Sequence, residues 1–298
     1  MSGTHAGEFY ALLTALCWTV AAMSFEAAGR RVGSLAVNFI RLVLALLFHS
    51  VFSLVMRGAL FPADAPAHAW FWLSLSGLVG FTIGDLLLFR ALVVVGARVS
   101  MLMMALVPPI TAIIGWAALG ETLSARGIAG MAVTVSGIVM VVLKKDGASG
   151  RLAFSHSVTG ILLALGGALG QAGGLILSKY GMGDYDPFAS TQIRVIAGTA
   201  GFAALFSVMR LWGRVSAGIK NGGALSRIAL GAMFGPFLGV SFSLYAVQRT
   251  ATGIASTIMG IVPVLIIVPA VLLFREKVTL REIAGSALAV TGVALFFS

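Results

Sequence analysis

Ten long apolar runs constrain this sequence more than any other feature. Each run holds about 20 residues, enough for a helix rising 1.5 Å per residue to cross a hydrocarbon core of about 30 Å. The runs lie at 9–28, 35–56, 69–90, 97–118, 125–143, 157–178, 187–210, 226–248, 253–274 and 281–297. Apolar and polar residues do not alternate in them, which favours helices over barrel strands. The sequence therefore predicts an all-α membrane protein with ten transmembrane helices.

The composition supports a lipid environment. Only 10% of the 298 residues are charged, and the mean hydropathy is +1.03. A soluble domain carries about 25% charged residues, so this chain has too few to cover its outside. The formal net charge of +10 is a poor indicator of nucleic-acid binding, because basic residues of membrane proteins gather in cytoplasmic loops. We expect the bilayer, and no nucleic acid, as a partner.

The basic residues also predict an orientation. The connections after the first, third, fifth, seventh and ninth runs hold fourteen Lys and Arg residues, and the opposite side holds four. The side rich in Lys and Arg is expected to be cytoplasmic. Both termini are therefore predicted outside the cytoplasm, in a multi-pass protein of the plasma (inner) membrane.

The second half of the chain repeats the first. At an offset of 155 residues, Pro108 aligns with Pro263 and Gly137 with Gly292. At an offset of 153, Arg41 aligns with Arg194 and Trp18 with Gln171. Each half, 1–146 and 147–298, then contains five helices. Because five is odd, the second half enters the membrane in the opposite direction, which predicts two inverted repeats around a central cavity.

Motifs near the end of each half carry a family resemblance. The first half has Pro108, Gly120-Glu121-Thr122-Leu123, Gly130 and Gly137, and the second has Pro263, Arg275-Glu276-Lys277-Val278-Thr279, Gly285 and Gly292. Over nearly its whole length the chain resembles the drug/metabolite transporter superfamily, in its ten-helix branch with two EamA-type repeats. The resemblance implies export of amino acids, metabolites or drugs. Amino-acid exporters, including those for aromatic amino acids, are the expected subgroup; nucleosides and cationic compounds are alternatives.

Several activities lack their sequence signatures. The chain has no G-x-x-x-x-G-K-[ST] loop for ATP, no paired Asp residues for Mg²⁺ and no His-x-x-x-His spacing for zinc. We therefore expect no enzyme activity, no cofactor and no metal. A channel or lipid scramblase would need a continuous polar stripe, and the polar residues are scattered. An internally duplicated chain does not need a second copy to complete its pore, so a monomer is expected.

Charged residues inside apolar runs are costly and suggest function. One interpretation is that those toward the cytoplasmic side form an ion-pair cluster that closes this end. Another is that Glu26 or Asp85 carries a coupling proton. On the other side, Lys179 and Arg194 are expected to form a matching cluster, unless Lys179 simply snorkels to the interface. The candidates for coupling or gating are Glu26, Arg41, Asp85, Arg90, Lys179 and Arg194.

Polar, aromatic and Met residues near helix midpoints are candidates for substrate binding. The repeat sets Trp18 opposite Gln171, so a ring could stack on an apolar substrate while the amide binds its polar end. The alternatives are a lipid-facing Trp18 and plain helix packing for the others. The substrate-binding candidates are Trp18, Gln171, Ser241, Tyr245, Met101 and Met104.

Prolines within two of the runs suggest bends. Pro108, Pro109 and Pro263 lie in the middle of the fourth and ninth runs, where each removes a backbone hydrogen bond. They are predicted either to act as hinges or to make static bends. Glu121 and Glu276 each precede a helix and are expected to stabilise its N-terminus. Together these features predict secondary transport by alternating access.

Overall fold

The computed structural model describes residues 6–119, 124–145, 152–249, 255, 258–275 and 277–297. The first half contains α1 (Ala6–Val32), α2 (Ser34–Arg57), α3 (Ala67–Gly77), the π-helix η1 (Leu78–Gly84), α4 (Asp85–Val94), α5 (Gly96–Met103), the 3₁₀ turn η2 (Met104–Leu106), α6 (Val107–Leu119) and α7 (Ala125–Val142). The second half contains α8 (Val158–Met182), α9 (Pro187–Val208), α10 (Trp212–Lys220), α11 (Gly222–Ala232), the π-helix η3 (Met233–Gly239), α12 (Val240–Arg249), α14 (Val262–Leu265), α15 (Ile267–Phe274) and α16 (Leu280–Phe297).

The prediction of a helical membrane protein is confirmed. Within the described residues, eight helical segments are long and apolar enough to cross a membrane. They are Ala6–Val32, Ser34–Arg57, Ala67–Val94, Gly96–Ile114, Ala125–Val142, Val158–Met182, Pro187–Val208 and Gly222–Arg249. The ninth predicted run falls on α14 and α15 and the tenth on α16, which are not among these eight. The number of ten spans therefore stays a prediction.

Side-chain caps explain where several helices begin. The side chains of Ser124, Ser157, Asp186 and Asn221 each accept a hydrogen bond from the backbone N–H three residues later. These caps satisfy amide groups that the first turn leaves without a helical partner. Glu121 and Glu276, predicted to stabilise helix starts, lie outside the described residues.

Two π-helical segments interrupt spans that the sequence predicts as regular helices. They are η1 and η3, and they lie at equivalent positions of the two halves, 155 residues apart. At the end of each segment, an N–H bonds to the carbonyl five residues back: Asp85 to Gly80, and Val240 to Gly235. A π segment widens the turn by one residue and is often found at functional sites.

The prolines within the fourth and ninth runs lie directly after breaks in the α-helix, and whether they act as hinges or make static bends stays a prediction. Pro108 and Pro109 lie in the first turn of α6, directly after η2, and Pro263 lies in the first turn of α14. The α-helix is thus already interrupted before each proline, because a residue without an N–H fits a first turn and not a helix interior. A fourth proline, Pro236, lies inside η3.

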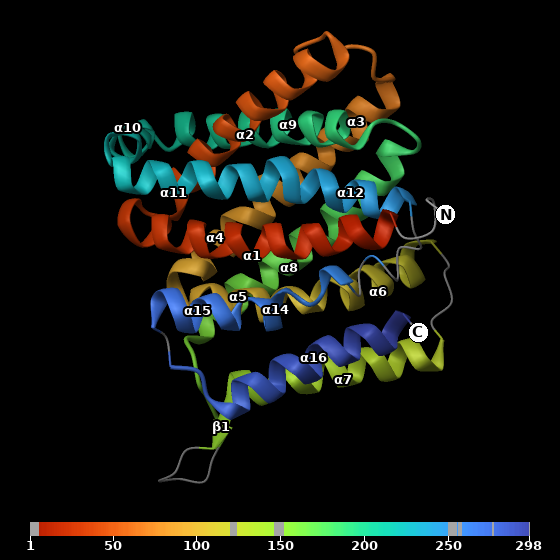
Figure 1. Cartoon of the computed structure of the whole chain (residues 1–298), viewed down its shortest axis with the longest axis vertical. Helices are drawn as coiled ribbons and strands as arrows, with labels where there is room; N and C mark the ends of the chain where they lie inside the picture. The colour runs from red at the N-terminus through yellow and green to blue at the C-terminus, as the bar shows by residue number, and fades with distance from the viewer. Residues whose placement is uncertain are drawn as a thin grey trace.

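The helices α7 and α16 lie side by side and antiparallel, at one edge of the bundle (Figure 1). Their glycines bring the two backbones into contact. A Cβ on Gly137 would lie 2.6 Å from the Gly285 carbonyl oxygen, and one on Gly292 would lie 2.7 Å from that of Gly130. In the repeat, Gly137 aligns with Gly292 and Gly130 with Gly285, so the two contacts are equivalent to each other. No side chain fits at either crossing.

The bundle has two ends that differ in their charge. The basic end holds the α1–α2, α4–α5 and α15–α16 connections together with α10. Contacts join its segments: the Ala97 N–H donates to Glu26, Arg98 to Glu282, and Arg281 to the Leu143 carbonyl. At the opposite end, Arg57, Asp64 and Tyr185 join the α2–α3 and α8–α9 connections.

A short hairpin and a short helix at the basic end were not predicted. Strand β1 (Leu143–Lys145) pairs antiparallel with β2 (Leu152–Phe154), with Leu143 opposite Phe154. The amphipathic α10 packs across the start of α2, where Gly218 meets Ile40. Both elements are too short for their periodicity to stand out beside the apolar runs.

Candidate functional site

A cavity of about 1180 Å³ lies inside the bundle between the two halves. The first half lines it with α1, α2, α3, η1, α4, the α5–α6 region and the start of α7, and the second half with α8, α9, η3, α12 and α14. The residues at its exposed rim, Ser124, Lys179 and Tyr180, belong to the end opposite the basic end. The lining includes these candidates from the sequence: Trp18, Arg41, Asp85, Met101, Met104, Pro108, Gln171, Lys179, Arg194 and Pro263.

The centre of the cavity wall is an ion pair between Arg41 and Asp85. Both residues are buried, with exposed fractions of 3% and 4%. Arg41 binds one Asp85 oxygen through its Nη2, and its Nε donates to Asn38 Oδ1 at 3.2 Å. The guanidinium also lies 4.4 Å from the centre of the Phe89 ring, a cation–π contact. A carboxylate in this surrounding needs such partners, because an unpaired buried charge is very costly.

Glycines bring Gln171 of the second half to this ion pair. A Cβ on Gly84 would lie 3.2 Å from the Gly170 Cα, and one on Gly174 would lie 3.0 Å from the Gly80 Cα. The backbones of η1 and α8 therefore touch. At this crossing, Gln171 Nε2 donates to the second Asp85 oxygen at 2.7 Å. Asp85 is thus held by one residue from each half.

Arg194, the repeat equivalent of Arg41, reaches the same wall from α9. Its exposed fraction is 4%, and its guanidinium lies 4.8 Å from the centre of the Phe81 ring. It is close enough to Asp85 for an electrostatic interaction. Yet the two Asp85 oxygens are bound by Arg41 and Gln171, and within the described part of the chain Arg194 Nε has no hydrogen-bond partner.

The other charged candidates lie apart from this centre. Glu26 is buried, accepts from exposed Arg30 at 2.7 Å, and accepts from the backbone N–H of Ala97 at 2.7 Å. Arg90 is exposed. Lys179 is exposed and lines the cavity at its rim. The structure therefore brings Arg41, Asp85 and Arg194 together instead of forming one cluster in each half of the membrane.

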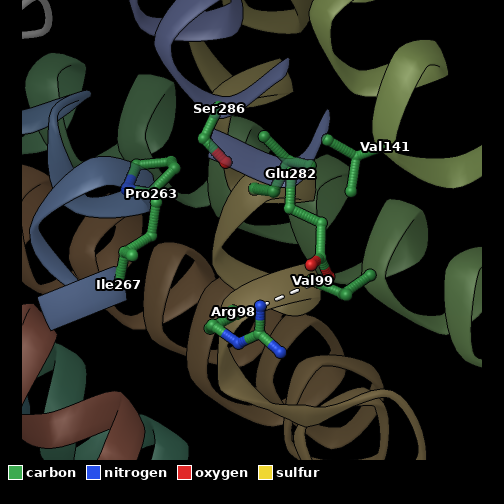
Figure 2. A pocket seen from close by; sticks show the side chains of 8 residues that line it. Arg98, Val99, Val141, Pro263, Ile267, Glu282 and Ser286 are labelled. Carbon is green, nitrogen blue, oxygen red and sulfur yellow. Dashed lines mark hydrogen bonds and ion pairs between the residues drawn. The ribbon is translucent and has the colours of Figure 1, made fainter. Parts of the chain in front are cut away.

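An ion pair at the basic end joins the two halves. Arg98 of α5 donates to Glu282 of α16 at 3.2 Å, beside a void of about 10 Å³ lined by Val99, Pro263 and Ser286 (Figure 2). Both side chains are largely buried, at 19% and 17% exposed. This pair and the contact between Glu26 and Ala97 lie on the side away from the cavity rim.

The uncharged candidates divide into two groups. Trp18, Met101 and Met104 line the cavity, and Trp18 packs against η3 at Gly239. Ser241 is buried, its hydroxyl has no hydrogen-bond partner among the residues that the structure describes, and it is not among the lining residues. Tyr245 packs on Tyr10, with ring centres 4.7 Å apart, and accepts a hydrogen bond from Arg249, away from the cavity.

Sequence reasoning missed three contributors to the site. Asn38 binds both Arg41 and the Asp85 carbonyl, Phe81 stacks on Arg194, and Glu282 pairs with Arg98. Asn38 could have been found as a polar residue one turn before an intramembrane arginine. Phe81 and Glu282 left no such signal, because their partners come from other helices.

Outside the membrane-spanning segments, one polar cluster has shifted pKa values. Slight burial disfavours the ionised form of Asp64, but hydrogen bonds from Tyr185 and Arg57 outweigh it and lower the pKa of Asp64. Burial raises the pKa of Tyr185, and its hydrogen bond to Asp64 adds to this effect. Among the described residues, no group of three or more His, Cys, Asp or Glu is arranged to hold a metal ion.

Comparison with known proteins places this architecture in a family. A search of curated proteins gave no significant match. A solved structure described as "Crystal structure of protein" shares the fold, with a TM-score of 0.65 at 16% identity, covering 98% of this chain and 96% of that chain. The model of the EamA-like transporter family matches twice, over residues 5–143 and 158–298. This chain is therefore a multi-pass membrane protein with a small-molecule substrate, and it belongs to the EamA-like transporter family.

Proposed function

We propose that this protein is a secondary transporter that exports a small amphipathic metabolite, an amino acid, by alternating access. The observation that carries the proposal is the cavity of about 1180 Å³ between the two halves, with Arg41, Asp85, Gln171 and Arg194 in its wall. Ligand sites are commonly apolar clefts with a few convergent polar groups. A cavity formed by one chain needs no second copy, so a monomer suffices.

Inverted repeats, 1–146 and 147–298, account for this arrangement. Three observations support them: the equivalent π segments η1 and η3, the equivalent arginines on one wall, and the antiparallel contact of α7 with α16. In the α7–α16 contact, Gly137 meets Gly285 and Gly292 meets Gly130. Replacing each glycine of the first contact by its repeat equivalent gives the second contact. Such an exchange is what a two-fold axis in the membrane plane produces.

The two ends of the cavity support a gating scheme. Its rim is exposed at the end opposite the basic end, while Arg98–Glu282 and Glu26–Ala97 hold the basic end shut. With the basic end in the cytoplasm, as the Lys and Arg distribution predicts, this is an outward-facing state of a plasma-membrane exporter. Loading from the cytoplasm then requires these contacts to open while the rim closes.

The cavity wall favours a substrate with an apolar body and a polar end. Trp18, Phe81 and Phe89 offer ring faces, and Met101 and Met104 offer adaptable apolar contacts. Asp85 is already bound by Arg41 and Gln171. This favours a fixed ion pair at Asp85 over a carboxylate that carries a coupling proton.

Counterflow in liposomes tests the proposal. The purified protein is reconstituted, loaded with one unlabelled amino acid, and exposed to a trace of the labelled compound; the panel contains Phe, Trp, Tyr, Thr and Met. We expect transient accumulation of at least one labelled amino acid above equilibrium. Protein-free liposomes give the background. Equilibration without an overshoot would indicate a channel, and no uptake of any panel member would remove amino acids as the substrate class.

A further inference from the structure

We infer that the cavity contains an anion subsite at Arg194, and that the substrate binds there through a carboxylate. This inference rests on the proposed transport function and deepens it. It makes the carboxylate the required polar group of the substrate, and it separates carboxylates from cationic and uncharged compounds.

The charge of the inner cavity wall supports the subsite. Two guanidinium groups, Arg41 and Arg194, face a single carboxylate, Asp85, among the described residues there. Arg41 and Asp85 form a direct ion pair and neutralise each other. One positive charge, that of Arg194, is left over at a site that excludes most of its solvent. A wall with an excess positive charge attracts an anion and repels a cation.

The hydrogen bonding of Arg194 also supports an anion subsite. A guanidinium carries five N–H donors in a planar fork that matches a carboxylate. Arg194 is 4% exposed, lines the cavity, and within the described residues its Nε has no partner. A buried donor without a partner is costly, and a ligand oxygen would remove this cost.

The surroundings of Arg194 define the rest of the ligand. Phe81 covers one face of the guanidinium at 4.8 Å and leaves its donor edges for an in-plane partner. Trp18, Phe89 and Met104 contribute apolar surface to the same cavity. A small carboxylate with an aromatic or branched apolar body fits both features. Asp85 already accepts a hydrogen bond at each oxygen, and its charge is paired with that of Arg41, so it attracts a substrate ammonium group less than an unpaired carboxylate would.

A binding experiment separates the polar groups of the ligand. Four probes share one phenyl ring: phenylalanine, 3-phenylpropanoate, phenylalaninamide and phenethylamine. Their saturable binding to the protein in nanodiscs is measured by calorimetry, without any need for transport. We expect 3-phenylpropanoate and phenylalanine to bind, and the amide and the amine to bind at least about tenfold more weakly. Equal binding of the amide, or no saturable binding of 3-phenylpropanoate at millimolar concentration, would overturn the subsite.

Variants locate the subsite on the chain. Arg194→Gln is expected to weaken 3-phenylpropanoate binding by about tenfold or more, and Arg194→Lys by less, because a lysine keeps the charge without the fork. Arg214→Gln, at an exposed arginine of α10, is the matched control and should bind as the unaltered protein does. Monodisperse gel filtration shows that each variant is folded. If Arg194→Gln and Arg194→Lys both bind normally, the inference is wrong even where counterflow succeeds.

Discussion

Arg41 and Arg194 occupy equivalent positions of the two halves and line one cavity, yet their surroundings differ. The partners of Arg41 include Asn38 at its Nε, Asp85 at its Nη2 and the Phe89 ring against its guanidinium. Arg194 keeps a ring contact with Phe81, and its Nε is unpartnered among the described residues. One arginine is part of the wall, and the other is available to a ligand.

The neighbours of the two arginines explain this difference. The repeat places Thr191 where the first half has Asn38, and Val240 where it has Asp85. The Thr191 hydroxyl donates to the Pro187 carbonyl of its own helix at 2.8 Å, and within the described residues it is not a hydrogen-bond partner of Arg194 Nε. Duplicated helices can thus keep a charge while its partners change, and a structural group in one half becomes a binding group in the other.

The largest predicted effect is on folding. Arg41→Gln leaves Asp85 buried without its ion-pair partner and is expected to lower the free energy of unfolding by about 3–5 kcal/mol. Arg194→Gln should lower it far less, since Asp85 keeps Arg41. Denaturant titration of the purified variants measures both values. Equal losses for the two variants would show that the arginines have the same role. The double variant Arg41→Met with Asp85→Leu should recover most of the loss.

A substitution in the second half should erase the difference between the arginines. Val240→Asp introduces a carboxylate at the position equivalent to Asp85, in the cavity lining. We expect it to neutralise Arg194 and weaken 3-phenylpropanoate binding about tenfold, measured by calorimetry. Val240→Asn, of the same size but uncharged, is the control and should have a smaller effect. Unchanged binding in Val240→Asp would contradict a free cationic Arg194.

The ion pair of Arg98 and Glu282 at the basic end is less buried than that of Arg41 and Asp85, and its loss should have a smaller effect. Glu282→Arg sets two cations against each other and is expected to shift the protein about fivefold toward a state open at this end. Thiol labelling of Val99→Cys, beside the pair, measures the opening in a Cys17→Ala background. The reversed pair, Arg98→Glu with Glu282→Arg, should restore the original labelling rate. Identical rates in all variants would show that the pair closes nothing.

The exposed pair of Arg57 and Asp64 should show the smallest effect. The pKa of Asp64 is lowered in the folded protein, so its contribution to stability is complete above its unfolded value of 3.8 and is lost as the pH falls through the lowered value. Asp64 is 59% exposed in its side chain, so solvent screens the pair. Melting temperatures of the unaltered protein and Asp64→Asn should differ slightly at pH 7 and converge at low pH. A gap that persists in acid would refute this linkage.

Much of the architecture was predictable from the sequence. The eight spans of the structure follow predicted apolar runs, and the family follows from motifs repeated in the two halves. Part of the cavity was predictable as well, because Trp18 and Gln171 are both mid-helix residues and repeat equivalents. An anion subsite at Arg194 was not predictable, because the sequence of an apolar run does not show which groups an arginine inside it will contact.

Apolar run length by itself determined that this chain is a helical membrane protein, because a backbone in lipid must satisfy its hydrogen bonds within each segment. Only the tertiary structure decided which charges meet. Gln171 reaches Asp85 because glycines let η1 and α8 touch. Arg194 Nε has no hydrogen-bond partner in the described part of the chain, and the position equivalent to Asp85 holds Val240, which has no group to accept from it. Helix period and hydropathy are properties of one segment, whereas the pairing of buried charges depends on how closely different segments pack.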